Sequence, residues 1–228
     1  MRRWMLFFGF FILSRTFLFS EEKIYFLHIP KTGGSTVTKL LRQHYSYGRR
    51  NEDIRLIGMR HLTYCQAKEI FKRYKIFTFL REPVARVLSE HRFCMNIHRG
   101  FPRMLNLHFL PAQGSPIETA SNIVCKILSG LDPRDSEISI EQHLASAKKN
   151  LAEELFFIGI TEKMNESIEL LYHLMGWQPP KEIPICNATD SSKEFYSQDV
   201  LDGIAKRNWA DIELYEYALK LFENQKKL

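Results

Sequence analysis

Three short apolar runs, each followed by a helical pattern, constrain the fold of this chain more than any other feature. They cover residues 24–29, 75–80 and 155–160, and each run is nearly continuous rather than alternating. Such a run is expected of a strand covered on both faces, as in a parallel sheet. Strands that alternate with helices indicate an α/β architecture. The sequence therefore predicts a P-loop-like α/β fold in three layers, with a central parallel sheet flanked by helices.

Helix boundaries follow from residues next to these runs. Pro83 is predicted as the first residue of the helix after the second strand, because proline suits that position. Thr161 is predicted to cap the helix after the third strand. Further helical patterns cover residues 66–74, 117–129, 140–154 and 209–222, and the loop-rich residues 99–115 are suited to face a substrate.

The size of the chain favours one domain. It has 228 residues, of which 45% are hydrophobic and 25% charged, so a disordered chain and a multi-span membrane protein are disfavoured. We expect an apolar leader at residues 1–20 and one domain at residues 21–228. Arg2 and Arg3 before an apolar run predict a signal or signal-anchor, hence membrane attachment or export. A leader that packs on a cytoplasmic domain is the alternative.

A small-residue loop after the first strand favours anion binding. It reads Lys31-Thr32-Gly33-Gly34-Ser35-Thr36 and opens a helix, whose first N–H groups and dipole attract anions. The lysine precedes the glycines, whereas the Walker A motif has lysine directly before its closing Ser/Thr. An ATP or GTP hydrolase is therefore disfavoured, and a turn without a ligand stays open.

This loop and residues 77–89 together resemble the paired signature of carbohydrate sulfotransferases, in particular the heparan sulfate 2-O-sulfotransferase group. The resemblance implies that the loop binds the 5'-phosphosulfate of 3'-phosphoadenosine 5'-phosphosulfate (PAPS), while a strand-end arginine and a helix serine bind the 3'-phosphate. The cofactor-binding residues it implies are Lys31, Thr32, Gly33, Gly34, Ser35, Thr36, Arg81 and Ser89. Residues 157–162 and 208–215 resemble later landmarks, so the resemblance covers most of residues 24–222. It also implies a Golgi-lumen location if the source is eukaryotic.

Two residues are predicted to be catalytic. Lys31 is placed to stabilise charge on the leaving phosphate oxygen, and a histidine best fits the base that removes the acceptor proton. The resemblance implies that this base is His61, although Arg60 stands where the group carries glycine. His28 and His91 fit packing roles better. His98 and His108 fall in the loop-rich stretch, where contact with substrate is open.

The sequence thus predicts a PAPS-dependent sulfotransferase that acts on a hydroxyl of an acidic or neutral glycan. The formal net charge of +6 suits an anionic partner, but no nucleic-acid motif is present, and no ligand cluster predicts a metal. A nucleotide or small-molecule kinase and a non-catalytic nucleotide-binding relative remain alternatives. The acceptor and the oligomeric state do not follow from the sequence.

Overall fold

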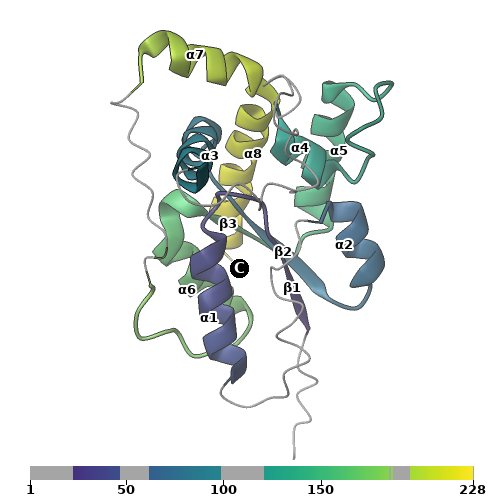
Figure 1. Ribbon diagram of the computed structural model, residues 1–228. Coiled ribbons are helices and arrows are strands. Elements are labelled where there is room, and N and C mark those ends of the chain that lie inside the picture. The colour runs from purple at the N-terminus through teal and green to yellow at the C-terminus, as the bar shows by residue number, and fades with distance from the viewer. Residues whose placement is uncertain (1–22, 47–61, 99–120, 185, 187–195, 228) are drawn as a thin grey trace, which may run out of the picture.

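The computed structural model describes residues 23–46, 62–98, 121–184, 186 and 196–227 (Figure 1). Its elements are β1 (Ile24–Leu27), α1 (Gly34–Ser46), α2 (Tyr64–Ile70), β2 (Lys75–Leu80), α3 (Pro83–His98), α4 (Ile123–Ser129), α5 (Ile140–Glu153), β3 (Phe157–Ile160), α6 (Met164–Leu174), α7 (Gln198–Arg207) and α8 (Trp209–Gln225). The predicted leader at residues 1–20 lies outside these ranges. Within them, no helix has the length and apolar character that crossing a membrane requires.

The three strands form one parallel sheet in the order β1-β2-β3. Ile24 pairs with Lys75, and Phe77 pairs with Phe157. All residues of β1 and β3 are buried, as expected for strands covered on both faces. The predicted parallel sheet of buried strands is confirmed, and because the strands are parallel their carboxyl ends share one edge.

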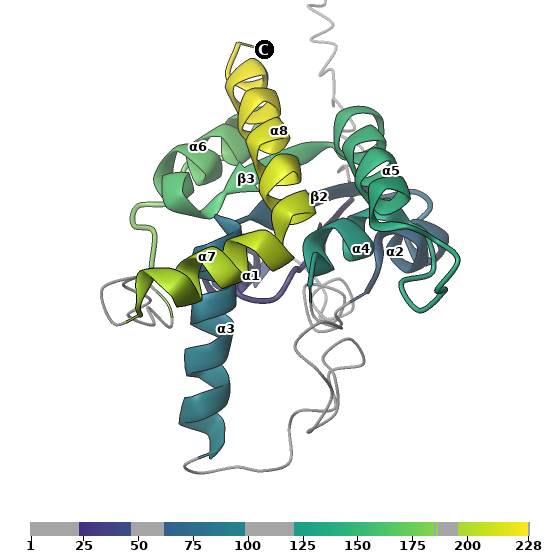
Figure 2. The same cartoon turned by 90° about the horizontal axis from the view of Figure 1, so that it is seen from above.

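Helices cover both faces of the sheet. In both views α1 and α6 lie on one side, and α2, α4 and α5 lie on the other (Figures 1 and 2). The last helix, α8, packs against both β3 and α5. The predicted mixed α/β architecture, with the sheet between helices, is therefore confirmed.

Aromatic rings fill the sheet core. Phe26, Phe77, Phe79 and Phe157 are all fully buried, with Phe26 stacked on Phe77 at 5.2 Å between ring centroids. Gly159 lies against the Phe79 ring, where a Cβ atom would come within 2.5 Å of a ring carbon. Aromatic pairs contribute about 0.5–1.5 kcal/mol beyond their buried area. The register of β2 and β3 is thus fixed by ring packing as well as by hydrogen bonds.

Two helix starts illustrate the outcome of the local predictions. Pro83 is the first residue of α3, as predicted. The predicted Thr161 cap is wrong, because a 3-10 turn covers Thr161–Lys163 and α6 begins at Met164. The Thr161 hydroxyl instead donates to strand-end carbonyls. Helix α7 was not predicted from the sequence, and Ile204 is its one buried residue, so most of its residues lie outside the core.

The starts of α4 and α8 cap each other across the fold. Asp211 of α8 accepts hydrogen bonds from the backbone N–H groups of Val124, at 3.1 Å, and Cys125, at 2.8 Å. Asn122, just before α4, accepts from the N–H groups of Ala210 and Asp211 at 3.0 and 3.2 Å. Burial raises the pKa of Asp211, while the two N–H groups act against that change. Each side chain thus satisfies helix N–H groups that otherwise lack partners.

The turn between β1 and α1 needs its two glycines. Gly33 has a φ of 81°, in the left-handed region that favours glycine. Gly34 lies against the imidazole of His28, and a Cβ atom at Gly34 would overlap that ring. The His28 ring stacks on Phe26 at 5.4 Å, so it has little room to withdraw. The start of α1 can therefore approach the end of β1 this closely only because Gly34 has no side chain.

We expect Gly34→Ala to lower the free energy of unfolding by about 1–3 kcal/mol, because the new methyl group overpacks the His28 ring. Urea unfolding followed by circular dichroism measures the change. Adding His28→Ala should recover part of the loss, which a double-mutant cycle detects. The matched control is Gly203→Ala in α7, where the nearest atom to a new Cβ lies 3.9 Å away. Equal losses at the two glycines would contradict this account.

We also expect Asp211→Ala to lower the free energy of unfolding by about 2–4 kcal/mol, because two buried N–H groups lose their acceptor. The same urea unfolding measures it. Glu213→Ala is the control, since that half-exposed carboxylate pairs with Lys148 on the surface. Its loss should stay within about 1 kcal/mol. A loss at Asp211 no larger than that at Glu213 would rule out the capping role.

Candidate functional site

The loop that joins β1 to α1 presents a helix start at the carboxyl edge of the sheet. Lys31, with a φ of 68°, and Gly33 both adopt left-handed backbone conformations. The Gly33 carbonyl accepts from the N–H groups of Thr36, at 3.0 Å, and Val37, at 3.3 Å, which closes the first turn of α1. The N–H groups before that turn have no carbonyl one turn earlier in the helix. Together with the helix dipole they make this edge suitable for a phosphate group.

The hydroxyl groups of two predicted cofactor residues donate inside the protein. Thr32 is fully buried and donates to the Ile29 carbonyl at 2.9 Å. Thr36 donates to the Pro184 carbonyl at 3.0 Å and accepts from the N–H of Cys186 at 3.4 Å. A hydroxyl has one proton to donate, so these two side chains shape the loop. Ser35, by contrast, is exposed in the first turn of α1.

One threonine hydroxyl joins the ends of the three strands. Thr161 follows β3, and its Oγ1 lies 2.9 Å from the carbonyl oxygens of both Thr32 and Leu80. Thr32 belongs to the loop after β1, and Leu80 is the last residue of β2. Because the single hydroxyl proton is shared between two acceptors, the three strand ends are held at one point. We refer to this interaction below as the strand-end hydrogen bond.

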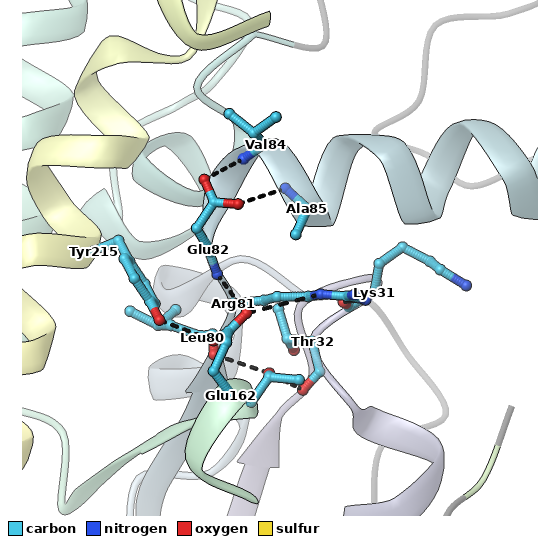
Figure 3. A network of polar contacts seen from close by, with 10 residues as sticks. Lys31, Thr32, Leu80, Arg81, Glu82, Val84, Ala85, Glu162 and Tyr215 are labelled. Carbon is cyan, nitrogen blue, oxygen red and sulfur yellow. Dashed lines mark hydrogen bonds and ion pairs between the residues drawn. The ribbon is translucent and has the colours of Figure 1, made fainter. Parts of the chain in front are cut away.

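Arg81 reaches the loop from the neighbouring strand. Its Nη1 donates to the Lys31 carbonyl at 3.3 Å, and its Nε lies 4.0 Å from Oε1 of Glu162 (Figure 3). Burial lowers the pKa of Arg81, whereas Glu162 and Glu82 raise it. An arginine remains protonated at neutral pH under such influences. The structure thus brings the Arg81 side chain to the backbone of the loop that carries Lys31.

The turn from β2 into α3 is held by acidic side chains. The Glu82 carboxylate accepts from the N–H groups of Val84, at 3.0 Å, and Ala85, at 2.8 Å, and so caps α3. The backbone N–H of Glu82 itself donates to Oε1 of Glu162 at 3.0 Å. The start of α3 is therefore fixed to the end of β3 (Figure 3).

The Lys31 side chain points toward α3. Its Nζ lies 4.0 Å from the ring centroid of Phe93, a cation–π distance. Figure 3 shows the side chain extending away from the Arg81 and Glu162 contacts. Ser89 lies one turn before Phe93 on the same helix face and is 1% exposed, whereas Phe93 is 41% exposed. The Lys31 ammonium thus lies beside an exposed ring, one turn from the predicted serine.

The structure describes some of the histidines considered as the base, but not His61. His61, predicted as the base, lies outside the described residues, as does His108, and the side chain of His98 is not described either. The described residues continue from Leu62, and Thr63 caps α2 through a reciprocal capping box with Gln66. His91 forms a hydrogen bond with the Tyr196 hydroxyl at 3.2 Å. The role of His61 therefore stays a prediction.

Sequence reasoning did not single out Glu162, Tyr215 or Phe93 for the site. Glu162 ends a segment that carried the resemblance, but no role was assigned to it. Tyr215 ends the other such segment, again with no role assigned, yet its hydroxyl donates to Oε2 of Glu162 at 2.8 Å. Glu162 directly follows a buried strand, and that position was the signal available. Across the described ranges, no group of three or more His, Cys, Asp or Glu side chains is arranged to hold a metal ion.

Comparison with known proteins identifies the family of this chain. The family model described as "Sulfotransferase family" matches residues 14–218. The chain is similar to heparan-sulfate 6-O-sulfotransferase 1-B of Danio rerio, with 26% identity over an alignment of 284 residues that covers 90% of this chain and 67% of the relative. Since the family model spans most of the sequence, including all three strands and the loop, the chain belongs to the sulfotransferase family and is a sulfuryl-transferring enzyme.

Proposed function

We propose that this enzyme transfers the sulfuryl group of PAPS to a hydroxyl of a carbohydrate. The observation that carries the proposal is the hydrogen bond from Arg81 to the Lys31 carbonyl, which places the Arg81 guanidinium beside the loop that opens α1. The carbohydrate acceptor is supported by the zebrafish relative, whose name states that it sulfates heparan sulfate. An acidic or a neutral glycan fits the proposal, and no nucleic-acid partner and no metal are part of it.

The residues present suit a donor with two phosphate positions. The turn at Gly33 and Gly34 and the start of α1 would hold the 5'-phosphosulfate through backbone N–H groups. Arg81 and Ser89 would hold the 3'-phosphate, since a helix residue two turns after a strand-end arginine approaches the same anion. Ser89 is covered in this structure, so its contact with phosphate requires its neighbours to shift.

The chemistry assigned to the chain has two parts. Sulfuryl transfer breaks the bond from sulfur to the 5'-phosphate oxygen and forms one to the acceptor oxygen, with the acceptor proton passing to a base. Lys31 would stabilise the charge on the leaving phosphate oxygen. His61 would accept the proton. A kinase on the same sheet is not favoured, because the loop lacks the Walker lysine order and the family is that of sulfotransferases.

We also propose that residues 1–20 direct the protein to a membrane or for export, with residues 21–228 as the catalytic domain. The support is the pair Arg2 and Arg3 before the apolar run. A Golgi-lumen location follows from this proposal if the source is eukaryotic.

Lys31→Ala and His61→Ala should each lower sulfuryl transfer by about 100-fold or more, because one removes charge stabilisation and the other the base. Labelled sulfate transferred from PAPS to a panel of polysaccharides measures this. Binding of adenosine 3',5'-bisphosphate should weaken much less than turnover. Lys226→Ala serves as the control, since Lys226 pairs with Glu166 and Glu223 on the surface. Normal turnover by both test variants would refute the assignment, and no incorporation into any glycan would refute the acceptor class.

Phe93→Leu should lower kcat about two- to fivefold, because leucine keeps the apolar bulk but loses the ring face that holds the Lys31 ammonium. Phe93→Trp should retain the wild-type rate, since indole binds cations at least as well. Steady-state kinetics of all three proteins at saturating PAPS provide the comparison. Equal rates for phenylalanine and leucine would show that the cation–π contact has no part in turnover.

A further inference from the structure

The carboxylate of Glu162 is held from two separate elements. Its Oε1 accepts from the backbone N–H of Glu82 at 3.0 Å, at the start of α3. Its Oε2 accepts from the hydroxyl of Tyr215 at 2.8 Å, from α8 (Figure 3). Since both oxygens have a donor on a different element, the carboxylate has a fixed position next to Arg81.

An acidic group at this place needs an explanation. Glu162 lies 4.0 Å from Arg81 Nε, and Arg81 is the residue proposed to bind a phosphate. A negative charge there lowers the local positive potential and taken alone would weaken anion binding. The carboxylate must therefore offer another advantage if it belongs to a phosphate site.

The advantage of the Glu162 carboxylate is that it orients the Arg81 side chain. An arginine side chain has many rotamers, and holding one of them before a ligand arrives reduces the entropy lost on binding. The Nε edge of Arg81 faces Glu162, and Nη1 donates to the Lys31 carbonyl at 3.3 Å. An ion pair and a hydrogen bond therefore restrain the guanidinium from two directions, and the hydrogen bond also restrains the Lys31 turn.

Tyr215 makes this arrangement persistent. Burial raises the pKa of the Tyr215 hydroxyl, and the neighbouring Glu162 carboxylate raises it further. The hydroxyl therefore stays protonated and donates throughout the pH range in which enzymes of this kind work. Tyr215 lies on α8, whose start is fixed to α4 by the Asp211 caps, so the donor is rigidly placed.

We propose that Glu162, fixed by Tyr215, is a positioning residue that holds Arg81 in the orientation that binds the 3'-phosphate of the sulfuryl donor. This inference rests on the proposed function. Its consequence is a preference for nucleotides with a 3'-phosphate over nucleotides without one.

The test measures that preference directly, without an acceptor. Calorimetry on the full chain gives the Kd for AMP and the Kd for adenosine 3',5'-bisphosphate, and their ratio is the 3'-phosphate preference. We expect the wild type to prefer the bisphosphate. Arg81→Ala should reduce the ratio at least about tenfold. Glu162→Gln should reduce it about fivefold, and Tyr215→Phe about threefold, as expected for partly exposed charges and hydrogen bonds.

The two explanations for Glu162 predict opposite signs. If the carboxylate only opposes the phosphate, Glu162→Gln binds the bisphosphate more tightly, and the proposal is overturned. An unchanged ratio in both Glu162→Gln and Tyr215→Phe overturns it as well. Glu213→Gln, which removes a surface charge elsewhere on α8, should leave the ratio unchanged. Should Glu162→Gln fail to fold, Tyr215→Phe still decides, because it removes a single hydroxyl.

The same binding measurements distinguish a wrong donor-site assignment from a wrong role for Glu162. If the wild type binds AMP and the bisphosphate equally, and Arg81→Ala changes neither, the donor site itself is wrongly assigned. If the wild type and Arg81→Ala behave as expected while the Glu162 and Tyr215 variants match the wild type, only the positioning role is wrong.

Discussion

The site depends on the strand-end hydrogen bond. The Thr161 hydroxyl shares its proton between the carbonyls of Thr32 and Leu80, so the ends of three parallel strands meet at one point. Each of these three residues has a charged neighbour in the chain, namely Lys31, Arg81 and Glu162. One hydrogen-bonded hydroxyl therefore holds together the backbone segments from which Lys31, Arg81 and Glu162 extend. A parallel sheet makes this possible, because its carboxyl ends share an edge.

The rest of the fold keeps that edge rigid. The buried phenylalanine rings fix the strands against one another, and the left-handed backbone of Lys31, which costs about 1–2 kcal/mol, is tolerated within this support. Helix α8 connects the sheet edge to α4. Asp211 fixes its start to α4, and Tyr215, one turn later, reaches Glu162. The stability of the core and the geometry of the site are thus linked through one helix.

Local patterns predicted the strands, their parallel arrangement and the start of α3, because apolar runs that alternate with helical patterns indicate a parallel α/β sheet. They could not predict the pairing of Glu162 with Tyr215, whose positions are far apart in the chain, since such contacts leave no periodicity. Thr161 shows why a local rule fails. A threonine before a helical pattern fits a cap, but two carbonyls at the sheet edge compete for its proton and accept it. For His61 the sequence prediction stands alone.

Donor binding and proton removal are assigned to different parts of the fold. The residues proposed for the donor adjoin the sheet edge, whereas the proposed base His61 precedes α2. That helix is fixed to the end of α5, because Glu154 accepts from the Tyr64 hydroxyl at 3.2 Å and pairs with Lys68 at 2.7 Å. Glu154 therefore supports α2 at a place separate from the strand-end hydrogen bond, which involves Thr161, Thr32 and Leu80.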